Sequence, residues 1–176
     1  MSESELKVRF EGLLARAASD PVAKTALALM LMKGEGVKKD AARAFVLYEE
    51  AAAEGNIAAI YNLGCMHLNG SCGKRDFDSA YALFTKAALA GDGDAMFNIA
   101  YMHDRGLGRD SDLSEALLWY TRSAELGIGR AQYDLAAVYH HGRGVDIDLA
   151  KAKHWYARAA ESGVARAIKD LAELGG

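Results

Sequence analysis

The fold of this chain is decided by residues 131–163, which read AQYDLAAVYHHGRGVDIDLAKAKHWYARAAESG. Within this stretch, small and apolar residues recur at helical spacing on both sides of a turn that contains Gly142 and Gly144. The same arrangement occurs three more times upstream, and the matched positions are displaced by 36 residues each time. Chance does not align so many positions at one period. The chain therefore contains an internal repeat, and the repeat determines the fold.

The repeat is visible as columns of identical or similar residues. The most regular columns are Gly55, Gly91, Gly127 and Gly163; Gly34, Gly70, Gly106 and Gly142; Asp40, Asp76, Asp112 and Asp148; Ala44, Ala80, Ala116 and Ala152; and Tyr48, Phe84, Tyr120 and Tyr156. Glycines at such places end helices, aspartates begin them, and alanines let two helices approach closely. Each unit therefore predicts a pair of antiparallel helices.

The second repeat shows how one helix pair is expected to form. A first helix is predicted over residues 57–69, because its apolar residues recur at helical spacing. Gly70 follows where the chain takes a left-handed conformation, which glycine adopts at little cost. Asp76 is the expected N-cap of a second helix over residues 77–90. In the third repeat, the run Asp112-Leu-Ser-Glu115 resembles a capping box.

These units must stack, because one helical pair cannot bury its two-sided apolar surface alone. We expect a single repeat domain over residues 1–176, with an N-terminal capping helix in 1–19, repeats at 20–55, 56–91, 92–127 and 128–163, and a C-terminal capping helix in 164–176. Val8 falls in the Ala44 column, and Lys169, Asp170 and Glu173 are expected on the open side of the last helix. The predicted fold class is all-α: a right-handed α/α solenoid of antiparallel helix pairs, with about four full repeats and two terminal half-repeats.

Composition excludes several other classes of protein. Hydrophobic residues make up 51% of the chain, which excludes global disorder. The formal net charge is −3, without the clustered basic excess of a nucleic-acid or anionic-membrane surface. No apolar run is long enough for a transmembrane helix, and the first residues lack the features of a signal peptide. We expect a cytoplasmic protein that binds no nucleic acid and does not insert into membranes; export after removal of a signal peptide is the alternative.

The repeated pattern resembles the Sel-1-like repeat family of α/α solenoids, which is related to tetratricopeptide repeats. The resemblance covers about residues 20–174 and is carried by the motifs A-x3-L-[GA]-x-M, G-x-G-V, D-x3-A and [YF]-x2-A-A-x2-G. The second repeat departs from the pattern, since Cys72 stands where the other repeats carry the second glycine of the turn. The resemblance implies a non-enzymatic bacterial adaptor, monomeric and without a cofactor. Such an adaptor binds a protein or an extended peptide in a concave groove lined by the first helix of each repeat.

Positions that vary between units are free to carry specificity. Opposite the buried face of the first helix, an arc carries rings and polar side chains: Tyr61, Asn62 and Cys65, then Phe97, Asn98 and Tyr101, then Tyr133 and Asp134. Large rings are unusual on a plain solvated face, and the Asn/Asp register is able to hydrogen-bond the backbone of a peptide. We predict that these residues bind the partner. The alternatives are that the rings pack between neighbouring helices and that the polar column is a solvent-facing ridge.

The sequence offers little support for other chemistry. It contains no nucleophile–base, phosphate-binding-loop or zinc-protease motif, so neither enzymatic activity nor a metal site is expected. His67 and His103 share one column near the buried centre of the first helix and are predicted to be interior histidines. A Cys65–Cys72 disulfide would need the Gly70 turn to fold back, because seven helical residues span roughly 10 Å. Two alternatives to the adaptor remain: small-molecule binding or hydrolysis in the same groove, and self-assembly through the last helix.

Overall fold

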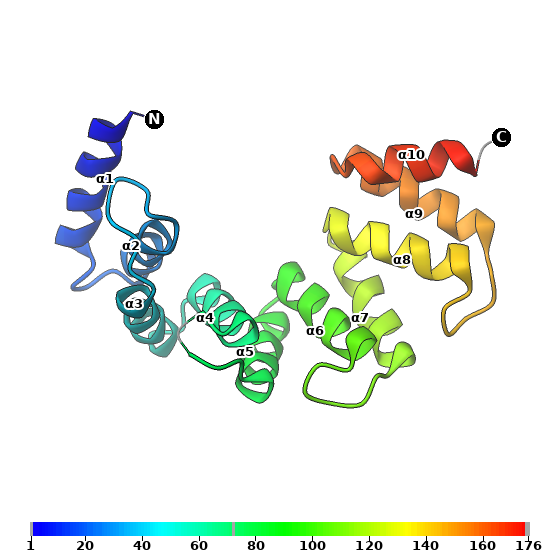
Figure 1. The fold of residues 1–176 in the computed structure, drawn as a ribbon, viewed down its shortest axis with the longest axis horizontal. Helices are drawn as coiled ribbons and strands as arrows, with labels where there is room; N and C mark the ends of the chain where they lie inside the picture. Colours follow the sequence, from blue (N-terminus) through cyan, green and yellow to red (C-terminus); the bar gives the residue numbers. More distant parts are fainter. Residues whose placement is uncertain (1, 72, 175–176) are drawn as a thin grey trace. The chain divides into compact units, whose positions relative to one another are not determined.

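Ten α-helices and no β-strand form the regular structure of residues 2–71 and 73–174, which are the residues described by the computed structural model (Figure 1). The helices are α1 (Glu3–Arg16), α2 (Pro21–Lys33), α3 (Ala41–Ala53), α4 (Ile57–Asn69), α5 (Phe77–Leu89), α6 (Gly93–Arg105), α7 (Leu113–Glu125), α8 (Gly129–His141), α9 (Leu149–Glu161) and α10 (Ala165–Glu173). From α2 onward, equivalent helices begin 36 residues apart, which confirms the all-α class and the period. The helices form two compact units, α1–α5 and α6–α10, and each unit is described by itself.

Each repeat pairs a first helix with a second helix that runs antiparallel to it: α2 with α3 and α4 with α5 in one unit, α6 with α7 and α8 with α9 in the other (Figure 1). The aspartate that precedes each second helix holds the pair together. Its carboxylate caps the second helix, as Asp76 does by accepting from the Ser79 amide. Its own amide donates to a carbonyl near the end of the first helix, at 2.9–3.0 Å in all four repeats.

The predicted capping box in the third repeat forms only in part. The Asp112 carboxylate accepts hydrogen bonds from the amides of Ser114 and Glu115, as expected. The Asp112 amide, however, donates to the carbonyl of His103 on the first helix, and not to the side chain of Glu115. The Asp112 amide is the donor that a complete capping box would need, and here it bonds the first helix instead.

The first helices end at the predicted glycines. Gly34, Gly70, Gly106 and Gly142 have φ values of 75°, 68°, 63° and 66°, in the left-handed region that glycine adopts without a steric cost. The second glycine of the turn is also crowded. A Cβ on Gly144 would lie 2.9 Å from Cβ of Leu113, at the start of α7. The first glycine of the G-x-G turn is therefore required by the left-handed backbone. The second glycine also leaves room for the preceding repeat.

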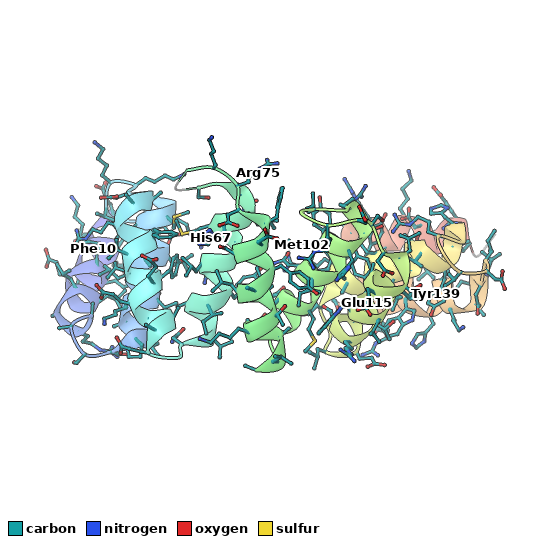
Figure 2. The ribbon with its side chains drawn as sticks, turned by 90° about the horizontal axis from the view of Figure 1, so that it is seen from below. Phe10, His67, Arg75, Met102, Glu115 and Tyr139 are labelled. Carbon is teal, nitrogen blue, oxygen red and sulfur yellow. The ribbon has the colours of Figure 1, made fainter. Side chains whose placement is uncertain are left out.

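Columns of small residues and rings fill the core of each unit. The fully or nearly fully buried members include Ala44, Ala80, Ala116 and Ala152 and the ring column Tyr48, Phe84, Tyr120 and Tyr156. Among the side chains labelled in Figure 2, Met102 is completely buried whereas Glu115 is exposed. The small residues let the helices of a pair approach, and the rings fill the space beside them.

Side-chain hydrogen bonds join the helices of the second unit, both within a repeat and, from Gln132 to Ala124, between successive repeats. Ser123, which is fully buried on α7, donates from its hydroxyl to the carbonyl of Gly93 at 2.7 Å. Gln132 on α8 is 1% exposed; its amide donates to the Ala124 carbonyl at 3.1 Å and accepts from the Ser162 hydroxyl at 2.8 Å. These buried polar groups are satisfied across helix boundaries, as buried polar groups must be.

The terminal helices differ from the full repeats, and one expectation for them was wrong. Val8 is 67% exposed, although its column is buried in every full repeat. Asp170 does not lie on an open side of α10. Its carboxylate accepts a 2.7 Å hydrogen bond from the hydroxyl of Tyr133 on α8.

Two glycine-to-alanine changes test the packing of the first unit. A Cβ on Gly64 would lie 2.8 Å from the Phe84 ring, so Gly64→Ala is expected to lower the free energy of unfolding by about 1–3 kcal/mol. Gly12, inside α1, has nothing within 4 Å of such a Cβ. Gly12→Ala is therefore expected to raise stability by about 0.5–1 kcal/mol. Urea denaturation measures both, and equal effects of the two changes would contradict the packing described.

Candidate binding surface on the first helices

The predicted residues of the second repeat lie on α4 and are all half-buried. The Tyr61 ring packs against Phe84 of the paired helix, with ring centroids 5.9 Å apart. The Asn62 amide donates from Nδ2 to the Ala58 carbonyl at 2.7 Å, one turn earlier in the same helix. Tyr61 is thus partly a packing residue, and Asn62 keeps its carbonyl oxygen and the second hydrogen of Nδ2 for another partner.

Asn62 and Cys65 line a pocket of about 140 Å³ together with Leu29 and Met32 of α2, Tyr48 of α3 and Met66 of α4. Asn69 and Ser71 complete the lining of this pocket, which we call the Tyr48 pocket. Among the residues that the structure describes, none that lines this pocket carries a formal charge at neutral pH.

Leu29 and Met32 were not among the predicted site residues, although a signal for them existed. Leu29 stands 36 positions before Cys65, which belongs to the predicted arc of the second repeat, and Met32 lies three residues further along the same helix. Extending the arc to the first repeat would have found both. Tyr48 was missed for a different reason: it belongs to the buried ring column, and the sequence alone gives such a residue a structural role.

The third repeat contributes a stacked pair of rings on α6. The Phe97 and Tyr101 rings are nearly parallel, at an interplanar angle of 16° and a centroid distance of 6.4 Å. Arg130 of α8 places its guanidinium 4.3 Å from the Phe97 ring centroid, and Arg105 places its own 5.7 Å from that of Tyr101. Tyr101 is 36% exposed. We call Phe97, Tyr101, Arg105 and Arg130 the Tyr101 cluster.

The other predicted residues of the second unit are less accessible. Phe97 also packs against Tyr120 of α7, with centroids 5.7 Å apart, and Asn98 is only 6% exposed. Tyr133 lies against Tyr156 at 5.5 Å and donates its hydroxyl to Asp170. The aromatic side chains of the arc are therefore shared between packing and surface.

Asp134 belongs to a network of charges that the sequence did not reveal. It is half-buried; burial raises the pKa of its carboxyl, and the neighbouring Asp104 carboxylate raises it further against the opposing effect of Arg143. The Asp104 side chain is 8% exposed and lies 3.1 Å from the Arg143 guanidinium. It also accepts a hydrogen bond from Tyr120 Oη at 3.4 Å. Asp134 therefore has charged neighbours within its own protein.

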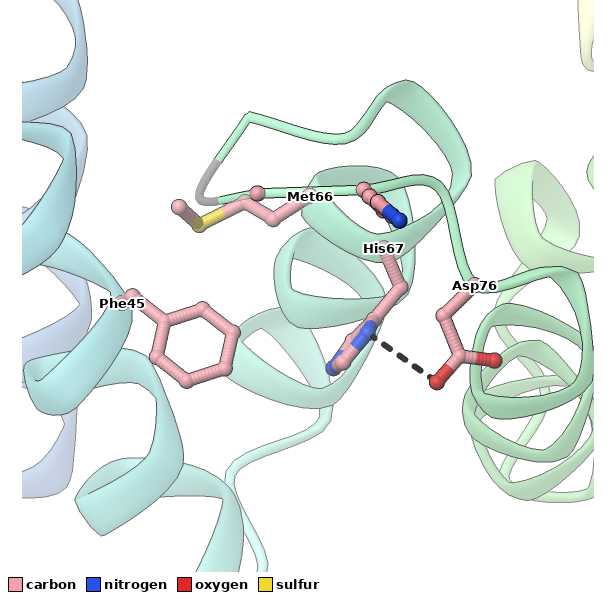
Figure 3. A pocket seen from close by; sticks show the side chains of 6 residues that line it. Phe45, Met66, His67 and Asp76 are labelled. Atoms are coloured by element: carbon pink, nitrogen blue, oxygen red, sulfur yellow. Dashed lines mark ion pairs between the residues drawn. The ribbon is translucent and has the colours of Figure 1, made fainter.

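A second pocket, of about 180 Å³, lies beside His67 in the first unit (Figure 3). Phe45, Met66, Lys74 and Asp76 are among its lining residues, and His67 Nδ1 lies 4.0 Å from Asp76 Oδ2. His67 is half-buried beside the Phe45 ring. The equivalent His103 is 8% exposed, and burial lowers the pKa of its imidazole.

Over residues 2–71 and 73–174, no group of three or more His, Cys, Asp or Glu side chains is placed to hold a metal ion. Within the same residues, no helix combines the length and the apolar character needed to cross a membrane. The sequence-based question of a Cys65–Cys72 bond concerns Cys72, which lies outside the described residues.

The paired helices, their 36-residue period and their glycine turns define an α/α solenoid repeat protein. The family described as Sel1 repeat matches residues 21–56, 57–92, 93–128 and 129–164. The chain therefore belongs to the Sel1 repeat family, as its sequence motifs predicted. Sel1 repeat proteins generally mediate protein–protein interactions and are generally non-catalytic.

Solved structures agree with this assignment. A Sel1 repeat protein from Oxalobacter formigenes is 34% identical, with a TM-score of 0.83 over 89% of this chain and 64% of the other. A protective antigen of uropathogenic Escherichia coli strains, which displays an SLR fold, is 28% identical, with a TM-score of 0.82 over 96% of this chain and 40% of the other. This chain thus spans less than two thirds of either protein. An immunity protein from Pseudomonas aeruginosa, 21% identical with a TM-score of 0.63 over 90% of this chain and 58% of its own, shares the fold. No curated protein matches the sequence.

The buried tyrosines beneath this surface make stability sensitive to alkaline pH. Burial raises the pKa of Tyr48 and of Tyr156 from 10.0 to about 12, and it raises that of Tyr120 as well. Between pH 10 and pH 12 the unfolded chain loses these protons while the folded chain keeps them. The free energy of unfolding is therefore expected to fall as pH rises through this range.

Urea denaturation from pH 8 to pH 12 measures this fall, and Tyr156→Phe provides the comparison. The variant lacks one titrating hydroxyl, so its slope should be shallower by about 1.4 kcal/mol per pH unit. Identical slopes for the wild type and the variant would show that Tyr156 titrates normally in the folded protein.

Proposed function

We propose that the first helices bind a segment of a partner protein and that the chain acts as a non-catalytic adaptor. The observation that carries the proposal is the Tyr101 cluster. It combines an exposed tyrosine with a stacked phenylalanine and two arginines, and tyrosine and arginine are enriched among the residues that dominate binding energy at interfaces. The rings are held by their own neighbours, so little conformational entropy is lost when a partner binds.

The predicted binding residues have different parts in this proposal. Tyr101 contacts the partner directly, and the outer edges of Phe97 and Tyr133 extend the contact. Asn98 is buried, so it supports the surface from within. Asp134 and Asp104 set the local charge, because both carboxylates lie close to Arg143. In the first unit, Tyr61, Asn62 and Cys65 offer half-buried side chains for the same purpose.

Tyr101→Ala tests the proposal, with Leu118→Ala as its matched control. Leu118 is 43% exposed on the second helix α7 of the same repeat, and so carries a comparable exposed apolar side chain on a different helix. The three proteins are used to capture partners from a native lysate, and captured proteins are identified by mass spectrometry. We expect a protein that is retained by the wild type and by Leu118→Ala but reduced at least tenfold with Tyr101→Ala, since hot-spot truncations cost about 2 kcal/mol or more.

Circular dichroism and thermal melting of both variants serve as the folding check, and both should match the wild type. Capture of the same proteins by Tyr101→Ala and by the wild type would overturn the proposal for the first helices. Phe97→Ala and Asn98→Ala are unsuitable for this test, because both side chains pack inside the second unit.

A further inference from the structure

The loops that join the two helices of a repeat differ in charge between the two units. In the first unit, the two residues before each capping aspartate are basic: Lys38 and Lys39, then Lys74 and Arg75. In the second unit, the same positions are acidic or neutral: Asp110 and Ser111, then Asp146 and Ile147. All four repeats form the same helix pair, so the scaffold does not require basic residues here.

The basic side chains at these loops of the first unit are exposed and unpaired. The set, which we call the basic loop surface, is Lys38, Lys39, Arg43, Lys74 and Arg75. Over residues 2–71 and 73–174, none of these side chains forms an ion pair or a hydrogen bond. In contrast, Lys24 of the same unit is held by two glutamates, and Lys33 is paired with Glu35. The charges of the basic loop surface are therefore available to an anion from outside.

Two pockets adjoin the basic loop surface. One, of about 400 Å³, is lined by Leu31, Val37, Lys38, Lys39, Asp40 and Arg43. The other is the pocket beside His67, whose lining includes Phe45, Met66 and Lys74 (Figure 3). Arg43 and Phe45 both belong to the start of α3, and residues two apart on a helix point about 200° apart. The two pockets therefore lie on opposite sides of the start of α3.

The carboxylates that line these pockets are engaged in capping the second helices. Asp40 accepts a 2.9 Å hydrogen bond from the Arg43 amide. Asp76 accepts from the amide and the hydroxyl of Ser79, at 3.0 and 2.7 Å, and the hydrogen bond from the Ser79 amide is the main cause that lowers the pKa of Asp76. Both carboxylates are directed to helix starts, so the lysine and arginine side chains keep an excess of positive charge.

The walls of both pockets combine cations with apolar side chains. Leu31 and Val37 line the larger pocket, and Phe45 and Met66 line the other. A carboxylate on a methylene stem matches this combination. A nucleic-acid backbone does not, because its phosphates follow one another without apolar stems and would also meet the capping aspartates.

The width of α3 sets the spacing of two such carboxylates. An α-helix with its side chains is roughly 10 Å across, and an extended chain advances about 3.3 Å per residue. A peptide that crosses the start of α3 therefore brings side chains three residues apart to the two pockets.

We propose that the basic loop surface binds an acidic, extended segment of a partner protein, whose carboxylates, three residues apart, enter the two pockets beside α3. This surface is formed by loops and by the start of a second helix, so the inference goes beyond the binding surface proposed for the first helices. The Tyr101 cluster belongs to the other unit, and the two proposals can therefore fail separately.

The experiment is a titration of the full chain, labelled with ¹⁵N, by capped hexapeptides, followed by amide NMR spectra. The main probe is Ala-Glu-Ala-Ala-Glu-Ala. One comparison peptide has glutamine in place of both glutamates, and another has the two glutamates adjacent. We expect the lowest Kd for the main probe, with shifts at the amides of Lys39, Arg43 and Lys74. The Kd should rise as sodium chloride is added, because salt screens exposed charges.

Single substitutions test each pocket. Arg43→Gln and Lys74→Gln each remove one exposed cation, and each should raise the Kd of the main probe about two- to fivefold, as expected for exposed ion pairs. Neither should change binding of the glutamine peptide. Lys86→Gln is the matched control, because Lys86 is an exposed lysine in the last turn of α5, away from the loops. This variant should bind the main probe as the wild type does.

Equal binding of the glutamate and glutamine peptides would overturn the proposal, as would the absence of shifts at the loops or an equal effect of Lys86→Gln and Lys74→Gln. Tighter binding of a single-stranded oligonucleotide than of the main probe would assign the surface to nucleic acid instead. A molecular mass that grows with protein concentration, and does not grow in Lys74→Gln, would assign it to a second copy of the chain. None of these outcomes alters the result expected for Tyr101→Ala.

Discussion

Every repeat of this protein depends on one aspartate that joins two helices. Asp76 shows the arrangement: its carboxylate caps α5, while its amide donates to the His67 carbonyl near the end of α4. Both contacts come from a single residue, so the start of the second helix is fixed to the end of the first. The glycine turn at Gly70 reverses the chain just before this point. With the helix pair set in this way, small residues and rings meet across it at the same positions in each repeat.

The ring column shows how a uniform scaffold acquires local differences. Four equivalent rings are buried in four equivalent places, but the residue 16 positions earlier is Met32, Leu68, Asp104 or His140. A polar residue there satisfies a tyrosine hydroxyl, whereas leucine accompanies a phenylalanine. Only in the first repeat does a tyrosine meet a methionine. Repeat proteins carry their function in positions that the scaffold leaves free. In this protein, the position that varies is the residue 16 positions before each buried ring.

Helical geometry placed the candidate residues on one arc, but it gave no information on what covers that arc. Asn98 and Phe97 point away from the centre of their helix pair by sequence, yet Asn98 is buried and Phe97 packs against Tyr120. Tyr101, one turn further along α6, is exposed. Neighbouring helices cover one end of the arc more than the other. For this reason the exposed members of a periodic pattern were found only from the packed structure.

The helix pairs, their period, their ends and the family could be predicted from the sequence, because they depend on local rules: glycine at the left-handed turn, aspartate at the helix start and apolar residues at helical spacing. The sequence also predicted the arc that contains Asn62, Cys65 and Tyr101, and as a binding surface this arc stays a prediction. Burial and the contacts between helices of different repeats depend on how the helices pack, as the exposure of Val8 and the hydrogen bond from Tyr133 to Asp170 show. The Tyr48 pocket belongs to this second group. Its walls come from three helices, and no periodicity along one chain segment reports on the space that they leave between them.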